Sequence, residues 1–98
     1  METHTKREWQ ALVKLFAQHS SLNEMDQLLH VFLTANERDF LVHRYKIVQA
    51  LLTKKVPQRK IAEELNVSIA KITAGSNELK RTKPAFKQIL MERMREER

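Results

Sequence analysis

The chain has 98 residues, a formal net charge of +6, no cysteine and four unclustered histidines, which excludes disulfides and argues against a metal site. Its length permits one domain, residues 1–98. A monomer of this size buries only about 60 to 65% of its unfolded surface, which gives little stability. We therefore expect association with a second copy to stabilise the fold. No apolar run reaches the ~20 residues that span a bilayer, and no signal peptide is evident, so we expect a cytoplasmic protein.

The first half of the chain predicts three helices, because apolar residues recur at helical spacing after residues that cap helix N-termini. The first helix runs to about residue 18, the second is short and mostly apolar, and the third ends near residue 53. The first helix is predicted to start at Thr5 with Glu8 and the third at Thr34 with Glu37, in each case as a capping box. The second is predicted to start at Ser21 or Asn23. These helices carry more apolar faces than so short a chain buries alone, so residues 9–53 are predicted to be dimerisation helices.

Residues 57–80 predict two short helices joined by a turn. Pro57 suits the first turn of a helix, Asn66 tolerates a left-handed backbone, and Ser68 can cap the following helix. The positions spaced to pack the two helices across one another are Ile61, Ala62, Leu65, Val67, Ile69 and Ile72. An ordinary helical hairpin has similar spacing. The surface of the second helix that is not needed for the core could face DNA; it holds Ala70, Lys71, Thr73, Ala74 and Asn77.

A last helix is predicted over residues 83–96, where Pro84 restarts the helical pattern. Its apolar face holds Phe86, Ile89, Leu90 and Met94. The chain is therefore expected to be all-α, with about six helices.

The excess of basic over acidic residues is confined to the second half of the chain. Residues 1–52 hold six basic and six acidic residues, whereas residues 53–98 hold twelve basic and six acidic ones. This pattern favours nucleic acid as partner, although a solvated basic surface or an acidic protein partner would also fit it. The candidates for neutralising phosphates are Lys54, Lys55, Arg59, Lys60, Lys71, Lys80, Arg81 and Lys83. No nucleophile–base arrangement or phosphate-binding glycine loop is evident, so we do not expect an enzyme.

Four motifs occur in one order: L-T-x-x-E-R, R-x-x-I-V-x-x-L-L, Q-R-x-I and I-T-x-G-S-N-x-L-K. With them the chain resembles the tryptophan repressor family over roughly residues 9 to 95, most strongly from Leu33 to Lys80. The resemblance implies an intertwined homodimer with two helix-turn-helix reading heads that represses transcription. Dimer symmetry then implies a palindromic operator in double-stranded DNA.

The resemblance also implies which residues contact DNA. Arg59 is the candidate for a base contact, since a guanidinium can donate two bonds to guanine, with phosphate binding as the alternative. For Ile69 the alternative is core packing, and Lys80 matches a basic position at the phosphate backbone. The complete set is Gln58, Arg59, Ile69, Ala70, Lys71, Thr73 and Lys80.

Members of the family use L-tryptophan as co-repressor, and here the chain departs from the pattern. Ala74 stands where a second arginine is expected, and Glu78 replaces a serine near the ligand amine, while Lys71 is a candidate replacement cation. Three outcomes stay open: weakened tryptophan sensing, a different small effector, and constitutive DNA binding without an effector. We favour retained sensing of tryptophan. The residues matched to the effector pocket are Leu33, Thr34, Arg44, Ala74, Gly75 and Glu78.

Overall fold

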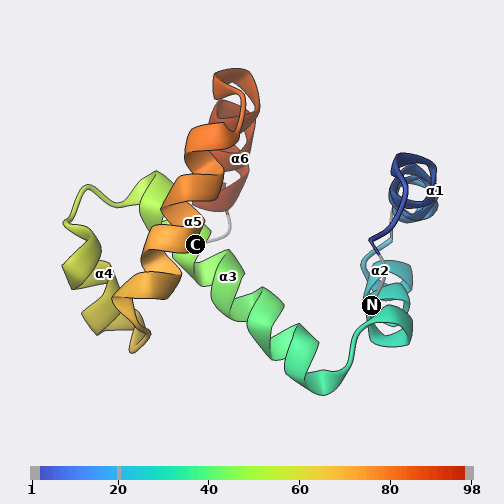
Figure 1. Ribbon diagram of the computed structural model, residues 1–98, viewed down its shortest axis with the longest axis horizontal. Coiled ribbons are helices and arrows are strands. Elements are labelled where there is room, and N and C mark those ends of the chain that lie inside the picture. Colours follow the sequence, from blue (N-terminus) through green and yellow to red (C-terminus); the bar gives the residue numbers. More distant parts are fainter. Residues whose placement is uncertain (1–2, 20, 97–98) are drawn as a thin grey trace. The chain divides into compact units, whose positions relative to one another are not determined.

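The computed structural model describes residues 3–19 and 21–96, and the side chains as far as Arg95. Within this part of the chain there are six α-helices and no strand (Figure 1). The helices are α1 (Lys6–Ala17), α2 (Leu22–Phe32), α3 (Ala35–Thr53), α4 (Gln58–Leu65), α5 (Ile69–Arg81) and α6 (Pro84–Glu96). The all-α prediction is confirmed. None of these helices is both long and apolar enough to cross a bilayer.

The chain divides into two compact units, the first ending at Arg38 and the second beginning at Asp39. The first unit contains α1 and α2, and the second contains most of α3 together with α4, α5 and α6. The two-helix pattern and the preceding long helix therefore belong to one unit. The single-domain organisation stays a prediction.

Side chains begin the helices of the first unit as predicted. The backbone N–H of Thr5 donates to Glu8 Oε1 at 2.7 Å and the Glu8 N–H donates to Thr5 Oγ1 at 3.1 Å, which is a capping box. The hydrogen bond from the Thr5 backbone is the main reason that the pKa of Glu8 is lowered. Of the two candidate starts for α2, Ser21 is the cap, since its hydroxyl accepts from the Glu24 N–H at 3.0 Å.

The same reciprocal capping begins α3. The Thr34 N–H donates to Glu37 Oε1 at 2.8 Å, and the Glu37 N–H donates to Thr34 Oγ1 at 3.2 Å. In the first unit the rings of Phe16 and Phe32 lie 6.0 Å apart, yet α1 and α2 have no buried residue. Their apolar faces thus remain largely open to solvent in a single chain.

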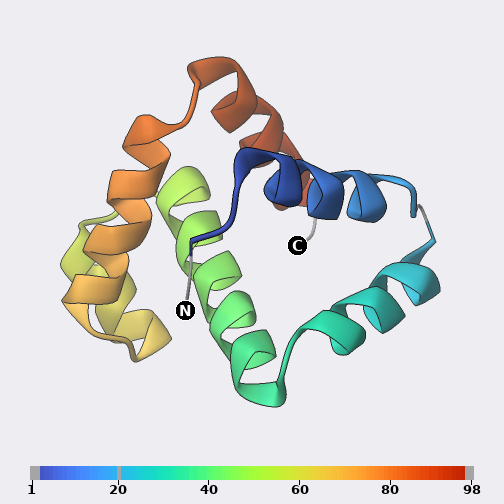
Figure 2. The same cartoon turned by 45° about the vertical axis from the view of Figure 1, so that its right-hand side comes forward.

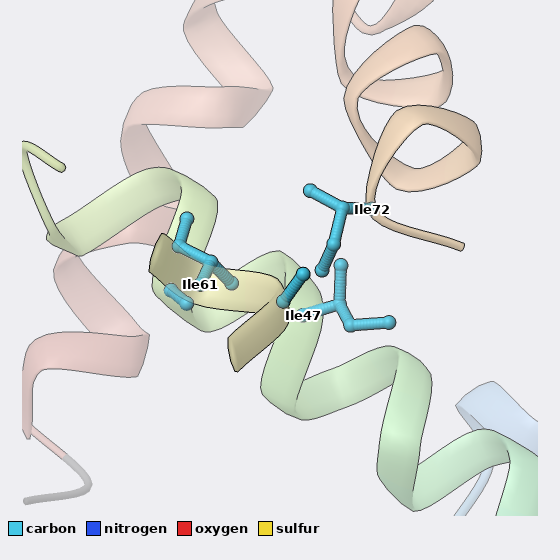
Figure 3. Close-up of a cluster of buried hydrophobic side chains, with 5 residues drawn as sticks. Ile47, Ile61 and Ile72 are labelled. Atoms are coloured by element: carbon cyan, nitrogen blue, oxygen red, sulfur yellow. The ribbon is translucent and has the colours of Figure 1, made fainter. Parts of the chain in front are cut away.

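The second unit has a small aliphatic core at the meeting point of α3, α4 and α5. Ile47, Ile61 and Ile72 are at most 2% exposed, and each comes from a different helix (Figure 3). Ala50 and Ala62 complete the buried cluster, and Leu51, Leu65 and Val67 pack against it. Full burial of each isoleucine contributes about 1.5 to 3 kcal/mol. The predicted packing positions are confirmed except for Ile69, which is 51% exposed because it begins α5 on the side away from the core.

A hydrogen bond joins α6 to α3, and one side chain of α6 is buried. Gln49 Nε2 donates to the backbone oxygen of Met94 at 3.1 Å, and Met94 is 7% exposed. Of the predicted apolar face, Leu90 is half-buried, whereas Phe86 and Ile89 are exposed. Only part of that face is therefore covered within one chain.

Candidate nucleic-acid interface and effector site

The turn between α4 and α5 is built by three residues with special backbone or capping roles. Asn66 ends α4 in the left-handed conformation, at φ 55° and ψ 49°, which asparagine tolerates better than most residues. Ser68 then caps α5 by accepting from the Lys71 N–H at 3.3 Å. Both predictions are confirmed. Pro57 is the N-cap of α4 and not a residue of its first turn, so that prediction was wrong by one position.

α5 is fixed along one face and exposed along the other. Ile72 and Gly75 are buried against the unit, whereas Ala70, Lys71 and Thr73 are exposed. α4 and α5 lie side by side in both ribbon views (Figure 1, Figure 2). The pair therefore presents the outer face of α5 on a support anchored by the core.

The predicted contact residues differ in how they are held. Gln58 Nε2 donates to Ser76 Oγ at 3.2 Å, so this side chain ties the start of α4 to α5. The Thr73 hydroxyl donates to the Ile69 carbonyl at 3.0 Å, which leaves its oxygen able to accept another bond. Arg59 is exposed and lines an open hollow of about 450 Å³.

Exposed cations surround this pair of helices, and two of them have carboxylate partners. Lys54 Nζ lies 3.1 Å from Glu64 Oε2, and Arg81 Nη1 lies 2.8 Å from Glu78 Oε1. Exposed pairs of this kind contribute only about 0 to 1 kcal/mol. Among the described residues, the other six predicted phosphate-neutralising cations form no ion pair; they are Lys55, Arg59, Lys60, Lys71, Lys80 and Lys83.

α5 approaches α3 closely at Gly75. A Cβ added there would lie 3.0 Å from Ile47 Cγ2 and 3.4 Å from Leu51 Cδ1, which accounts for glycine in the middle of a helix. One helical turn earlier in α5, the Lys71 ammonium lies 5.3 Å from the centre of the Phe40 ring of α3. Sequence reasoning missed Phe40, because nothing in its local pattern marks a contact with α5.

The predicted effector residues fall in both units. Arg44, Ala74, Gly75 and Glu78 belong to the second unit, and Leu33 and Thr34 belong to the first. On α3, Arg44 lies one turn after Phe40 and one turn before Ile47, so it shares the helix face that meets α5.

Some groups proposed to hold an effector already have partners. The carbonyl of Leu33, one of the residues matched to the effector pocket, accepts from Arg38 Nη1 at 2.9 Å. Sequence reasoning missed this role of Arg38. The Thr34 hydroxyl caps α3, and the Glu78 carboxylate pairs with Arg81. An amine that binds at Glu78 would therefore compete with Arg81. In the described parts of the chain, no three His, Cys, Asp or Glu side chains are placed to hold a metal ion.

Comparison with known proteins then decides the family. The model of the Trp repressor protein family matches residues 7–94. The chain belongs to the Trp repressor family. This family is one of transcriptional regulators and not of enzymes, so the chain is a repressor-type regulator.

Individual relatives agree with the family match. A "Trp operon repressor homolog" of Chlamydia trachomatis serovar L2 is 40% identical over 90 residues, which cover 92% of this chain and 96% of the relative. The protein of the same name from Pasteurella multocida is 38% identical over 90 residues, which cover 92% of this chain and 88% of the relative. The protein of the same name from Haemophilus influenzae strain PittEE is 40% identical over 81 residues, which cover 83% of this chain and 80% of the relative.

Proposed function

We propose that the chain is a homodimeric repressor that reads a palindromic DNA operator with α4 and α5 and is modulated by L-tryptophan or a related small molecule. The observation that carries the proposal is the asymmetry of α5. Its inner face is fixed by Ile72 and Gly75, while its outer face is exposed and begins at a capped N-terminus. A helix held in this way can enter a major groove without losing its own core contacts.

Two kinds of DNA contact are proposed for this reading head, defined as α4 and α5. Arg59 is exposed in the first turn of α4 and is assigned to base recognition, because its guanidinium can donate two bonds to guanine O6 and N7. Lys80 is exposed in the last turn of α5 and is assigned to the phosphate backbone. Ile69, at 51% exposure, is available for apolar contact with a base.

Dimerisation is supported by the apolar side chains that α1, α2 and the start of α3 leave exposed. Leu22 is 91% exposed, Val31 76%, Trp9 53% and Val42 50%. Large apolar side chains concentrated in one part of a monomer indicate an association surface. Since neither α1 nor α2 buries a residue within one chain, a second copy is the proposed cover. A symmetric dimer would present two reading heads, which is why the proposed operator is a palindrome.

The effector assignment rests on Arg44 of α3 and on the small side chain of Ala74 in α5. Arg44 is exposed and can stack on a planar ligand, and the exposed Ala74 adds only a methyl group to α5. Ala74 lacks the cation that the family pattern places there. One charged hydrogen bond contributes about 1.5 to 3 kcal/mol, so its loss would weaken tryptophan binding by roughly one to two orders of magnitude.

DNA binding is tested by fluorescence anisotropy on a selected operator and on random duplex, each at several salt concentrations. Arg59→Ala should weaken binding to the operator more than binding to random DNA. Lys80→Ala should weaken both equally and reduce the slope of log K against log salt by about 0.9, the value for one lost phosphate contact. Lys6→Ala, a change in the first unit, is the matched control for general charge. Equal losses on both DNAs for Arg59→Ala would refute its base-reading role.

Effector binding is tested by titration calorimetry of the wild-type protein and of Ala74→Arg with L-tryptophan. We expect roughly ten- to hundredfold tighter binding by Ala74→Arg, because the added guanidinium can pair with the ligand carboxylate. Ala74→Leu controls for the added bulk. If neither the wild type nor Ala74→Arg binds tryptophan, the tryptophan assignment is wrong and a different effector or constitutive repression replaces it.

A further inference from the structure

The start of the recognition helix α5 is held against α3 by a contact between a cation and an aromatic ring. The Lys71 ammonium lies 5.3 Å from the centre of the Phe40 ring, within the roughly 6 Å over which a ring attracts a cation. Phe40 is in α3 and Lys71 is in the first turn of α5, and both belong to the second unit. The contact therefore joins the supporting helix to the part of α5 that enters the groove in the proposed function.

This contact lies one helical turn from the close approach of α5 to α3 at Gly75. Gly75 is packed on Ile47 and Leu51, and Lys71 precedes Gly75 by four residues on the same helix. Phe40 likewise precedes Ile47 by two turns on the face of α3 that meets α5. Ile72 and Gly75 both pack on the core beside α3 near the middle of α5. The contact between Phe40 and Lys71 extends this attachment toward the N-terminus of α5 and so restricts the angle at which α5 leaves α3.

The Lys71 ammonium forms no ion pair in the described part of the chain. The ion pairs there join other residues, and the nearest acidic position along α5, Glu78, pairs with Arg81 at 2.8 Å. Phe40 is 66% exposed, so its ring packs on few other side chains and is available to the ammonium. Lys71 is thus directed toward α3, although its position in the sequence suggested a phosphate contact.

We propose that Phe40 is a positioning residue of the reading head, which acts by holding the Lys71 ammonium and so fixes α5 on α3 without an effector. This inference rests on the proposed function and deepens it, because it assigns Lys71 to orientation of the helix and not to the DNA backbone. It also supplies a physical reason for DNA binding in a chain whose effector pocket lacks the expected arginine at Ala74.

The contact itself is tested without DNA by a double-mutant cycle on thermal or urea unfolding. Phe40→Leu removes the ring but keeps an apolar side chain, and Lys71→Met removes the charge but keeps the length. We expect the two changes to be coupled by a factor of about two to five in the unfolding equilibrium constant, which corresponds to an exposed cation–π contact. Phe86→Leu combined with Lys71→Met is the matched control and should show no coupling. A coupling factor of one between Phe40→Leu and Lys71→Met, which means that the two changes are independent, would overturn the proposal.

The role in DNA binding is tested by the salt dependence of operator affinity. Lys71→Met and Phe40→Leu should each weaken binding about two- to fivefold with an unchanged slope of log K against log salt. Lys80→Met should reduce that slope by about 0.9. Phe40→Trp should keep the wild-type affinity for the operator, because an indole ring holds a cation at least as well as a phenyl ring.

Two results distinguish failure of this inference from failure of the proposed function. A slope reduced by Lys71→Met as much as by Lys80→Met would assign Lys71 to phosphate and overturn its positioning role, with DNA binding intact. Absence of operator binding by the wild type would instead overturn the proposed function, and with it any role of Phe40 in DNA recognition. Sedimentation of each variant checks that the association state is unchanged.

Discussion

Gly75→Ala is a sensitive test of the packing that holds α5 against α3. The glycine is helical, so alanine should gain about 1 kcal/mol from helix propensity alone. The added Cβ, however, would lie 3.0 Å from Ile47 Cγ2. Ile47 is 2% exposed and β-branched, so it cannot turn away. Overpacking of this kind costs about 1 to 3 kcal/mol, and the net expectation is a loss of about 1 kcal/mol.

The measurement is thermal unfolding at a fixed protomer concentration, since association shifts apparent stability. For a chain of this size the expected loss lowers Tm by about 4 to 8 °C. Ala74→Gly, a change at the exposed neighbouring position, measures the propensity contribution by itself. Ile47→Leu moves the branch away from Cβ, so it should recover part of the loss when combined with Gly75→Ala. A Tm raised by several degrees in Gly75→Ala would refute the close approach of α5 to α3.

Two further predictions concern the turn and the first helix. Asn66→Ala should destabilise the protein by about 1 kcal/mol because the position is left-handed, whereas Asn66→Gly should not; equal melting temperatures for the two variants would contradict this. The lowered pKa of Glu8 means that its ionised form stabilises the folded state. That contribution is complete above the ordinary pKa of 4.5 and disappears as the pH falls through the folded-state pKa. Glu8→Gln should therefore be less stable than the wild type at pH 7 and equal to it at low pH, as measured by urea unfolding, and a difference independent of pH would exclude this role.

Helix boundaries were predictable where a short side chain caps its own helix. Thr5, Ser21, Thr34 and Ser68 each accept from an N–H three residues later, so the signal lies within one turn of sequence. Asn66 was predictable for a similar reason, since few residues adopt its backbone conformation. Pro57 was placed one position too late in the helix because the fixed φ of proline fits the extended N-cap, at φ −60° and ψ 150°, as well as the first helical turn.

Contacts between helices were less accessible from the sequence. The bond from Gln58 to Ser76 and the contact of Lys71 with Phe40 depend on how α4 and α5 pack. Ile69 has the spacing of a core residue, yet it lies at the very start of α5, where the helix has not reached the core. The effector residues were assigned by resemblance alone, and that resemblance did not indicate that Arg38 bonds to the Leu33 carbonyl.

The central claim is that two copies of this chain place two recognition helices in successive major grooves of one duplex. Selection of binding sites from random double-stranded DNA, followed by footprinting of the enriched sequence, tests it most directly. The account predicts a palindrome whose half-sites are about 34 to 36 Å apart and are protected on one face of the duplex. Enrichment of no sequence, or protection of a single half-site by a monomer, with or without L-tryptophan, would contradict it.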